Sequence, residues 1–320
     1  MTFNEANTVE AFTRDRLKSI GWEFIDHSRL PRQPQDVLVE DHLREALVRL
    51  NPAISERPER ADEVLYRLRA AIMTVRDTGL VKANEEFAAW LLGERSMPFG
   101  ENGEHVTIRL IDFEDFKQNH FVVTQQYTIR MGKTEKRADL VLLVNGMPLV
   151  VIEAKTPVRS SESWFDGALQ IHDDYEKNVP ELFVPNLCSV ATEGKEYRYG
   201  SIAMPVELWG PWRLEDEGDA PGSMEQVEQA VLSMLRPNTV LDLLANFTSY
   251  ATHKGKQRIK LIARYQQVDG ANKIVQRVVA GKTRKGLIWH FQGSGKSLLM
   301  LFASRKLRMH PTLKNPTVLV

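Results

Sequence analysis

The stretch Lys136–Pro157 constrains the fold more than any other part of this sequence. Two apolar runs, Leu140–Val144 and Leu149–Ile152, flank the dipeptide Asn145-Gly146. An Asn-Gly pair between apolar runs is a strong short-range signal for a β-hairpin. Runs with so few polar residues are typical of strands buried on both faces, as in the inside of an α/β sheet. We therefore expect a mixed α/β fold built around this hairpin.

Polar side chains are confined to the open end of the predicted hairpin. Asp139 lies on the first strand, and Glu153 and Lys155 lie on the second, two residues apart and thus on one face. Two neighbouring carboxylates form an oxygen site for a hard cation such as Mg²⁺. A bound metal can activate water against a phosphodiester, while the lysine stabilises the developing charge. The pattern predicts a catalytic set of three residues with Asp139 and Glu153 as metal ligands.

The register of the hairpin tests this interpretation. With a strict two-residue turn, Asp139 pairs with Ile152 and faces away from Glu153. A shared metal site therefore requires an odd-numbered loop or a β-bulge, and we predict one. The alternative is a salt-bridged strand end without chemistry. A second Glu-x-Lys pattern, Glu193 to Lys195, has no Asp on a partner strand, and we expect a solvated hairpin tip there.

A second group of residues is typical of phosphate binding. A Gly-rich turn follows Leu287–Trp289, which we expect to be a strand, and precedes an amphipathic helix. Backbone N–H groups at a helix N-terminus cradle phosphate, a lysine reaches the β/γ-phosphates and a serine binds Mg²⁺. His290 stands where the general pattern has its first glycine, and we assign it no chemistry. The predicted ATP-binding residues are Gly293, Ser294, Gly295, Lys296 and Ser297.

These two groups carry a resemblance to a known family. The spacing of Asp139, Glu153 and Lys155 resembles the PD-(D/E)xK nuclease core, and both VNGMPLVVIEAKTP and WHFQGSGKS are similar to segments of type I restriction enzyme R subunits. The resemblance implies a further acidic residue on an N-terminal helix, which Glu10 matches. It also implies an adenine-binding glutamine before the phosphate loop. Gln267 matches this residue best, and Gln266 is the second candidate.

One feature of the sequence departs from the family pattern. The family has a Gln-x-x-x-Tyr element on the helix after the lysine strand, whereas here Gln170 and Tyr175 are five residues apart. Residues three or four apart share a face of an α-helix, and residues five apart do not. By this criterion the spacing places Gln170 and Tyr175 on different faces of a helix. A role in the nuclease site and, for Tyr175, a packed aromatic are the two alternatives.

The charge of the chain is unevenly distributed. Residues 1–250 carry a balance of −14, and residues 251–320 carry +14 with a single acidic residue. Such a cationic segment usually faces the phosphates of nucleic acid or nucleotide, and an acidic protein partner is the alternative. Its DNA binding would weaken steeply with salt. We expect three regions, which are a nuclease domain with a helical insertion (1–212), a linker with connecting helices (213–245) and the start of an ATPase lobe (246–320).

The resemblance implies a restriction-endonuclease-like mixed sheet flanked by helices, followed by the beginning of a P-loop RecA-like α/β domain. It implies the endonuclease and ATP-dependent DNA-translocating subunit of a type I restriction–modification system, which cleaves unmethylated foreign duplex DNA with Mg²⁺ and acts with methyltransferase and specificity subunits. The alternatives are a helicase–nuclease of DNA repair and a non-catalytic scaffold that binds DNA or nucleotide. Since only 23 residues follow Ser297, we expect no processive ATP hydrolysis from these 320 residues.

Composition limits the remaining possibilities. The single Cys188 excludes a disulfide framework, and the absence of paired Cys or His spacings argues against structural zinc. No apolar run approaches the roughly 20 residues needed to cross a bilayer. The N-terminus has no basic stretch followed by an apolar core, so we expect no secretory signal. We expect a protein of the bacterial or archaeal cytoplasm without membrane contact.

Overall fold

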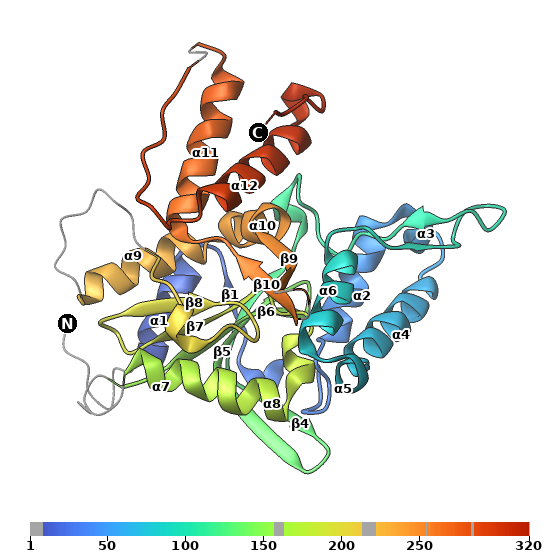
Figure 1. The fold of residues 1–320 in the computed structure, drawn as a ribbon. Coiled ribbons are helices and arrows are strands. Elements are labelled where there is room, and N and C mark those ends of the chain that lie inside the picture. The colour runs from blue at the N-terminus through green and yellow to red at the C-terminus, as the bar shows by residue number, and fades with distance from the viewer. Residues whose placement is uncertain are drawn as a thin grey trace.

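The structure is a computed structural model that describes residues 9–156, 163–212, 222–253, 255, 257–282 and 285–319. Its centre is a six-stranded sheet with the strand order β1-β4-β5-β6-β7-β8 (Figure 1). The pairs β1–β4 and β6–β7 are parallel and the other neighbours are antiparallel, so the predicted mixed sheet is confirmed. The strands are β1 (Glu23–Phe24), β4 (Phe121–Met131), β5 (Thr134–Val144), β6 (Met147–Ala154), β7 (Cys188–Thr192) and β8 (Tyr197–Gly200).

The Asn-Gly turn between β5 and β6 is buried instead of lying at the surface. Asn145 and Gly146 both have positive φ angles, 50° and 80°, as a tight hairpin turn requires. The Asn145 amide donates to the Leu110 carbonyl at 2.8 Å, and its oxygen accepts from the His120 N–H at 2.7 Å. A Cβ at Gly146 would lie 2.3 Å from the Val39 carbonyl oxygen. The turn is therefore held by hydrogen bonds and close packing against the segments that contain Val39, Leu110 and His120.

Helices pack against the strands of the sheet. Helix α1 (Val9–Ser19) packs on β4 and β5, and α7 (Trp164–Leu169) packs on β6 and β7. After α7 the chain continues as a π-helix (Gln170–Tyr175) and α8 (Glu176–Asn178), within the single helix that the sequence predicts. Helix α9 (Met224–Met234) lies against α1 and β8. The acidic residues 213–221 lie outside the described part of the chain.

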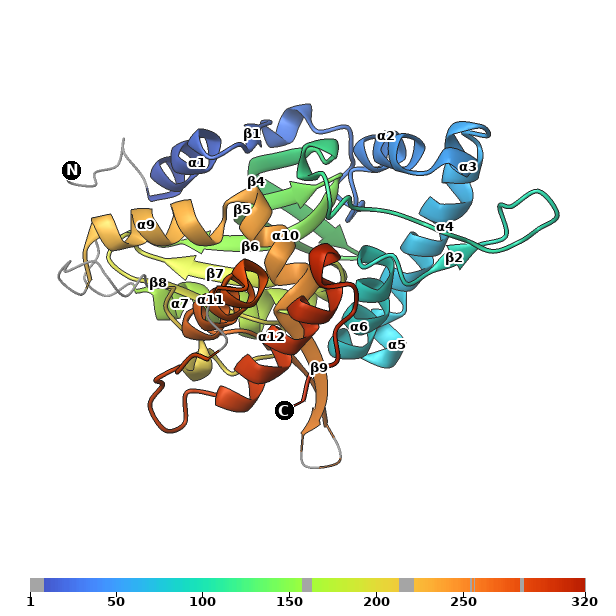
Figure 2. The same ribbon diagram turned by 90° about the horizontal axis from the view of Figure 1, so that it is seen from above.

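The predicted helical insertion forms a separate group of helices beside the sheet, visible in both orientations (Figures 1 and 2). A short strand pair accompanies these helices, because Val106–Thr107 (β3) pairs with Ser96–Met97 (β2). The insertion comprises α2 (Glu40–Leu50), α3 (Pro52–Ser55), α4 (Arg60–Met73), α5 (Val75–Thr78) and α6 (Leu80–Leu91).

The basic C-terminal region joins the sheet through a hairpin. Helix α10 (Pro237–Asn246) leads into β9 (Thr248–His253), which pairs with β10 (Gln257–Ile262). Helices α11 (Tyr265–Ala280) and α12 (Lys296–Met309) follow and pack on each other (Figure 2).

The hairpin of β9 and β10 is attached to the sheet domain by polar contacts. The Lys260 ammonium is buried and donates to the Asn186 carbonyl at 2.6 Å. The Lys260 carbonyl accepts from the Ser201 hydroxyl at 2.8 Å, and the Tyr199 hydroxyl donates to the Ala263 carbonyl at 2.8 Å. The start of the basic region thus packs directly against strands of the central sheet.

One expected strand is absent from the described residues. Leu287–Trp289 has no strand partner there, and Leu287 and Trp289 are 83% and 88% exposed. That expectation is wrong because an apolar run becomes a strand only when a hydrogen-bonded neighbour lies beside it. Within the described helices, none is long and apolar enough to cross a membrane.

Candidate active site

A β-bulge brings the two predicted carboxylates together. Next to the turn, β5 and β6 pair as a two-residue hairpin requires, but the register then shifts so that Leu142 faces Val150 and Leu149 is extra. The shifted register pairs Leu140 with Ile152 and, one step further, sets Asp139 beside Glu153. Directly paired residues of antiparallel strands project on the same face. The predicted bulge is confirmed.

A second irregularity lies on the other side of β5. The register of β4 and β5 pairs Gln125 with Leu140 and Tyr127 with Ala138, so that Gln126 lies opposite Asp139 without a shift of register. Gln126 has a φ of 54°, in the left-handed region. Sequence reasoning missed this residue, because neither a glycine nor an asparagine marks the left-handed position.

The carboxylates of the site are buried, and few donors or positive charges balance their negative charge. Asp139 accepts from the Ala154 N–H at 2.9 Å. The Lys155 ammonium lies 3.2 Å from Oε1 of Glu153, while Oε2 of Glu153 is buried without a hydrogen-bond partner among the described residues. Burial, and then the charge of Asp139, raise the pKa of Glu153 to about 8. Burial also raises the pKa of Asp139. The site concentrates negative charge that a cation would neutralise.

The donor atoms fit a hard divalent cation. Asp139 and Glu153 offer only oxygen ligands, and the unpartnered Oε2 of Glu153 is a coordination position that the chain itself leaves unused. In the described part of the chain, no three His, Cys, Asp or Glu side chains are close enough together to hold a metal ion. The two carboxylates would therefore be the side-chain ligands, and water and a phosphate oxygen would complete the shell, as is usual for Mg²⁺.

Glu10 lies near this pair but is held by amides. The Gln125 and Gln126 side chains donate to its Oε1 at 2.9 and 3.0 Å, and Gln126 reaches Oε2 at 3.1 Å. Burial raises the pKa of Glu10, and the charge of Asp139 adds to that effect. The resemblance correctly directs attention to Glu10 as a residue near the carboxylates, although its catalytic role stays a prediction.

Gln170 and Tyr175 are brought together by the π-helix, which corrects the expectation that their spacing separates them. A π-helix hydrogen-bonds residue i to residue i+5, so residues five apart are neighbours. The Lys155 ammonium donates to the side-chain oxygen Oε1 of Gln170, and the side-chain nitrogen Nε2 of Gln170 donates to the Tyr175 hydroxyl. The hydroxyl donates in turn to the Arg137 carbonyl at 2.9 Å. This chain of hydrogen bonds ties Lys155 to the strand that carries Asp139.

The second Glu-x-Lys pattern has a structural role that the sequence did not predict. Glu193 is buried instead of solvated, because its carboxylate accepts from the Trp164 N–H at 3.0 Å and the Glu196 N–H at 3.1 Å. The first of these bonds satisfies a free N–H at the start of α7. Lys195 is exposed to solvent.

The Gly-rich loop has the geometry of an open anion site. Gly293 and Gly295 have φ angles of 84° and 78°, and α12 begins at Lys296. Lys296 and Ser297 are exposed, and the Lys296 ammonium lies over the loop, where it donates to the carbonyls of His290 at 3.2 Å and Phe291 at 3.0 Å. The buried Ser294 is also part of the loop. The free N–H groups at the start of α12 are suited to phosphate.

Gln267 lies beneath the loop. Its amide nitrogen donates to the carbonyls of Ser294 at 3.1 Å and Gly295 at 3.3 Å, and its oxygen accepts from the Arg264 N–H at 2.9 Å. It is 2% exposed, so both polar ends are engaged by the main chain. Gln267 therefore supports the loop in this structure, and adenine recognition by it stays a prediction.

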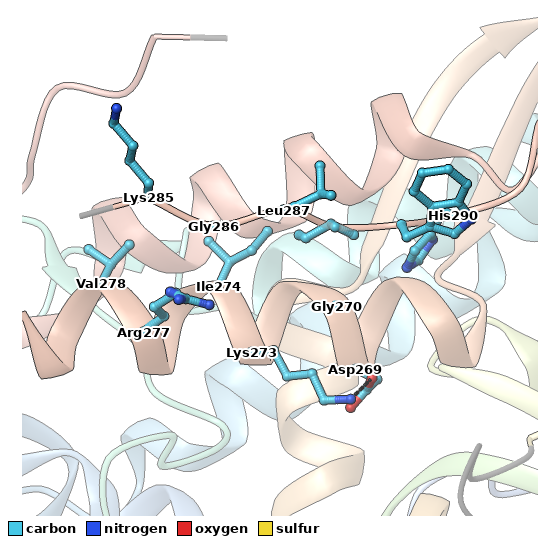
Figure 3. Close-up of a pocket in the computed structure, with 12 residues that line it drawn as sticks. Asp269, Gly270, Lys273, Ile274, Arg277, Val278, Lys285, Gly286, Leu287 and His290 are labelled. Atoms are coloured by element: carbon cyan, nitrogen blue, oxygen red, sulfur yellow. Dashed lines mark ion pairs between the residues drawn. The ribbon is translucent and has the colours of Figure 1, made fainter. Parts of the chain in front are cut away.

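A cavity of about 420 Å³ opens between α11 and residues 285–290 (Figure 3). Lys273, Arg277 and Lys285 line it, and Lys273 pairs with Asp269 at 2.7 Å. The exposed Trp289 forms part of its wall. The cavity belongs to the basic region and is formed by elements other than those that carry Asp139 and Glu153.

Comparisons with known proteins find matches for both parts of the chain. Residues 2–204 match the family model of the type I restriction enzyme R protein N terminus, and residues 266–320 match a SWI2/SNF2 ATPase model. The chain is 33% identical to the type I restriction enzyme HindI endonuclease subunit of Haemophilus influenzae, over 98% of this chain and 31% of that protein. It is 27% identical to the putative type I restriction enzyme MjaIXP endonuclease subunit of Methanocaldococcus jannaschii, over 98% and 32%. The chain spans about a third of the length of these relatives, and it belongs to the family of type I restriction enzyme R proteins, whose N-terminal part it matches.

Proposed function

We propose that this chain acts in a type I restriction–modification system as the subunit that cleaves duplex DNA and couples cleavage to ATP-dependent translocation. The observation that carries the proposal is the bulge that sets Asp139 beside Glu153, with Lys155 on the same face as Glu153. A salt-bridged strand end would need neither two adjacent buried carboxylates nor an unpartnered oxygen. The methyltransferase and specificity subunits would be its partners, and unmethylated foreign DNA its substrate.

The residues of the site would divide the work as follows. Asp139 and Glu153 would hold Mg²⁺, which when bound supplies a Lewis acid for the phosphodiester and lowers the pKa of a water molecule. Lys155 would stabilise the charge that develops on the phosphate, and its contact with Gln170 keeps the ammonium directed at the site. None of these groups reads bases, which suits a nuclease whose target is chosen by another subunit.

The loop 293–297 would bind the phosphates of ATP. The Lys296 ammonium would exchange its two carbonyl acceptors for the β- and γ-phosphates, and Ser297 would contact the associated Mg²⁺. The net charge of +14 over residues 251–320 would add contacts to the DNA backbone.

The test uses the full-length protein reconstituted with its partner subunits on unmethylated closed-circular plasmid, with Mg²⁺ and ATP. Cleavage and ATP hydrolysis are measured for the wild type, Lys155→Ala, Lys296→Ala and the matched control Lys195→Ala. We expect Lys155→Ala to lose cleavage and keep ATP hydrolysis, Lys296→Ala to lose both, and Lys195→Ala to resemble the wild type. Cleavage by Lys155→Ala at the wild-type rate would overturn the proposed active site.

Two other outcomes would support the alternative functions. If Lys296→Ala cuts at the wild-type rate, the nuclease does not depend on the motor, and the DNA-repair helicase–nuclease becomes the better interpretation. If Mg²⁺ binding, measured by calorimetry, is unchanged by Asp139→Ala, the non-catalytic scaffold is favoured.

A further inference from the structure

The backbone of Gln126 is held in a conformation that its residue type does not favour. Left-handed φ angles suit glycine and, less well, asparagine and aspartate, because a Cβ crowds the following carbonyl. Gln126 nevertheless has a φ of 54°, at the position opposite Asp139 on the neighbouring strand. An unfavourable backbone conformation persists when the surrounding structure requires it, and such residues gather at functional sites.

The left-handed backbone changes where the Gln126 side chain points. Consecutive residues of a regular strand project on opposite faces. Gln125 and Gln126 are consecutive, yet both amides donate to the carboxylate of Glu10, at 2.9 Å from Gln125 and at 3.0 and 3.1 Å from Gln126. The departure of Gln126 from the extended backbone of a regular strand accompanies this convergence on one group. Gln125 is itself fixed by Arg14, which donates to its oxygen at 2.9 Å.

The neutrality of these donors is what suits them to a cation site. An arginine or lysine in place of Gln126 would hold Glu10 as well, but its positive charge would oppose a metal ion nearby. The amide instead fixes the carboxylate and leaves its negative charge in place. Gln126 also lies opposite Asp139 on the neighbouring strand, so the carboxylate that it holds is close to the proposed metal ligand Asp139.

We propose that Gln126 is a positioning residue of the nuclease site, which holds the carboxylate of Glu10 beside Asp139 so that its charge strengthens binding of the divalent cation. This inference rests on the proposed function. Because Glu10 belongs to no three-residue ligand group in the described chain, it acts here through its charge and orientation. Gln126 would act only through Glu10 and would not contact DNA.

A glycine substitution separates this role from a structural one. Gln126→Gly removes the amide and, at the same time, relieves the left-handed backbone. If the residue were merely structural, the variant would be as stable as the wild type or more so, with unchanged chemistry. Ala203 provides the matched control, because it also has a positive φ, 53°, and its N–H contact to Glu176 would survive in Ala203→Gly.

The experiment measures plasmid cleavage by the reconstituted full-length enzyme as a function of Mg²⁺ concentration, with thermal unfolding and ATP hydrolysis alongside. We expect Gln126→Gly to raise the Mg²⁺ concentration for half-maximal cleavage by about five-fold or more, the scale of one nearby charge. ATP hydrolysis and the melting temperature should not fall. Ala203→Gly should show no change, and Gln126→Asn, which keeps an amide and tolerates the backbone, should recover part of the loss.

A double variant tests whether Gln126 works through Glu10. In the Glu10→Gln background, Gln126→Gly should cause no further loss, whereas independent effects would multiply. The inference would be overturned if Gln126→Gly needed the same Mg²⁺ concentration for half-maximal cleavage as the wild type. It would also be overturned if the double variant lost activity by the product of the two single losses.

Mg²⁺ alone, titrated calorimetrically into the 320-residue chain, keeps this test separate from that of the proposed function. If the wild type binds Mg²⁺ but does not cleave, the proposed function fails, and the binding data still decide the role of Gln126. Weaker binding by Gln126→Gly than by Ala203→Gly supports the role, and equal binding refutes it.

Discussion

Gln170 and Tyr175 are five residues apart and hydrogen-bonded to each other, because the chain between them is wound as a π-helix. A π-helical turn is equivalent to an α-helix with one residue inserted, and such turns often occur at functional sites. The turn connects Lys155 through Gln170 and Tyr175 to the Arg137 carbonyl. The inserted residue thus changes the sequence spacing without changing which side chains meet.

Deleting one exposed residue from this turn should convert it to an α-helix. Asp173 is exposed, and its ion pair with Lys177 is a surface contact of little energy. Without Asp173, Gln170 and the tyrosine would be four apart and still neighbours. We expect plasmid cleavage to stay within about three-fold of the wild type, since the lost surface pair contributes little. Asp173→Ala is the control, and loss of cleavage as complete as in Gln170→Ala would contradict this account of the turn.

The raised pKa of Glu153 predicts how the stability of the metal-free protein depends on pH. With a pKa near 8 in the folded state, Glu153 keeps a proton that the unfolded chain releases near pH 4.5. The free energy of unfolding should therefore fall as pH rises from about 4.5 to about 8. Glu153→Gln, which carries no charge, should remove this part of the dependence and be more stable than the wild type at pH 8, as measured by urea denaturation.

In the presence of Mg²⁺, the wild type should be more stable than Glu153→Gln. At one hundred times its dissociation constant, a bound ligand adds about 2.7 kcal/mol to the free energy of unfolding. We expect the wild type to gain this stability and Glu153→Gln to gain almost none. The exposed Glu114 supplies the control Glu114→Gln, which should follow the wild type with and without Mg²⁺. Equal stabilisation of wild type and Glu153→Gln would exclude Glu153 as a ligand.

Lys260 should lower the stability of the fold at neutral pH. Burial lowers its pKa to about 7, so the unfolded chain takes up a proton between pH 10.5 and pH 7 that the folded protein does not. The free energy of unfolding therefore decreases as pH falls through this range. Lys260→Met should be more stable than the wild type at pH 7, and the difference should close near pH 10.

The hydrogen bond lost in Lys260→Met should cost little. The Asn186 carbonyl also accepts from the Asn84 amide at 2.9 Å, so it keeps a partner when Lys260 is replaced. Lys117, which is exposed, supplies the control Lys117→Met, for which no pH-dependent difference is expected. A Lys260→Met protein that is less stable than the wild type at pH 7 would show that the contact outweighs burial of the charge.

Gly146 should tolerate no side chain. A Cβ there would face two penalties, the left-handed φ of 80° and an approach of 2.3 Å to the Val39 carbonyl oxygen. Gly132 has a similar φ of 61°, and no described atom lies within 4 Å of its would-be Cβ. We expect Gly132→Ala to lower the free energy of unfolding by about 1 kcal/mol. Gly146→Ala should lower it by about 3 kcal/mol because overlap is added to strain. Equal losses in urea denaturation would contradict the close packing of the turn.

The sequence predicts the central hairpin well, because its signals are local. The apolar runs and the Asn-Gly pair indicate the strands and the turn without reference to the rest of the chain. The bulge at Leu149 could also be predicted, although only by assuming that Asp139 and Glu153 act together. The left-handed backbone at Gln126 could not, because the Glu10 carboxylate that its side chain contacts lies on α1, more than a hundred residues away in the chain.

The predictions that were wrong also depend on contacts between residues far apart in the sequence. The π-helix results from contacts of Lys155 and Arg137 with its two ends, and an α-helical pattern in the sequence does not reveal them. Glu193 resembles a solvated turn residue until the start of α7 is placed beside it. Leu287–Trp289 has the composition of a strand but lacks a neighbouring strand in the described chain.

The bulge at Leu149 makes the parity of the hairpin a requirement for the proposed chemistry. Each residue inserted or deleted between Asp139 and Glu153 moves one carboxylate to the opposite face of the sheet, whereas a change of two residues restores it. Single-residue changes in this hairpin would thus leave its composition nearly intact and still separate the pair. The tolerated lengths of the segment should alternate between active and inactive.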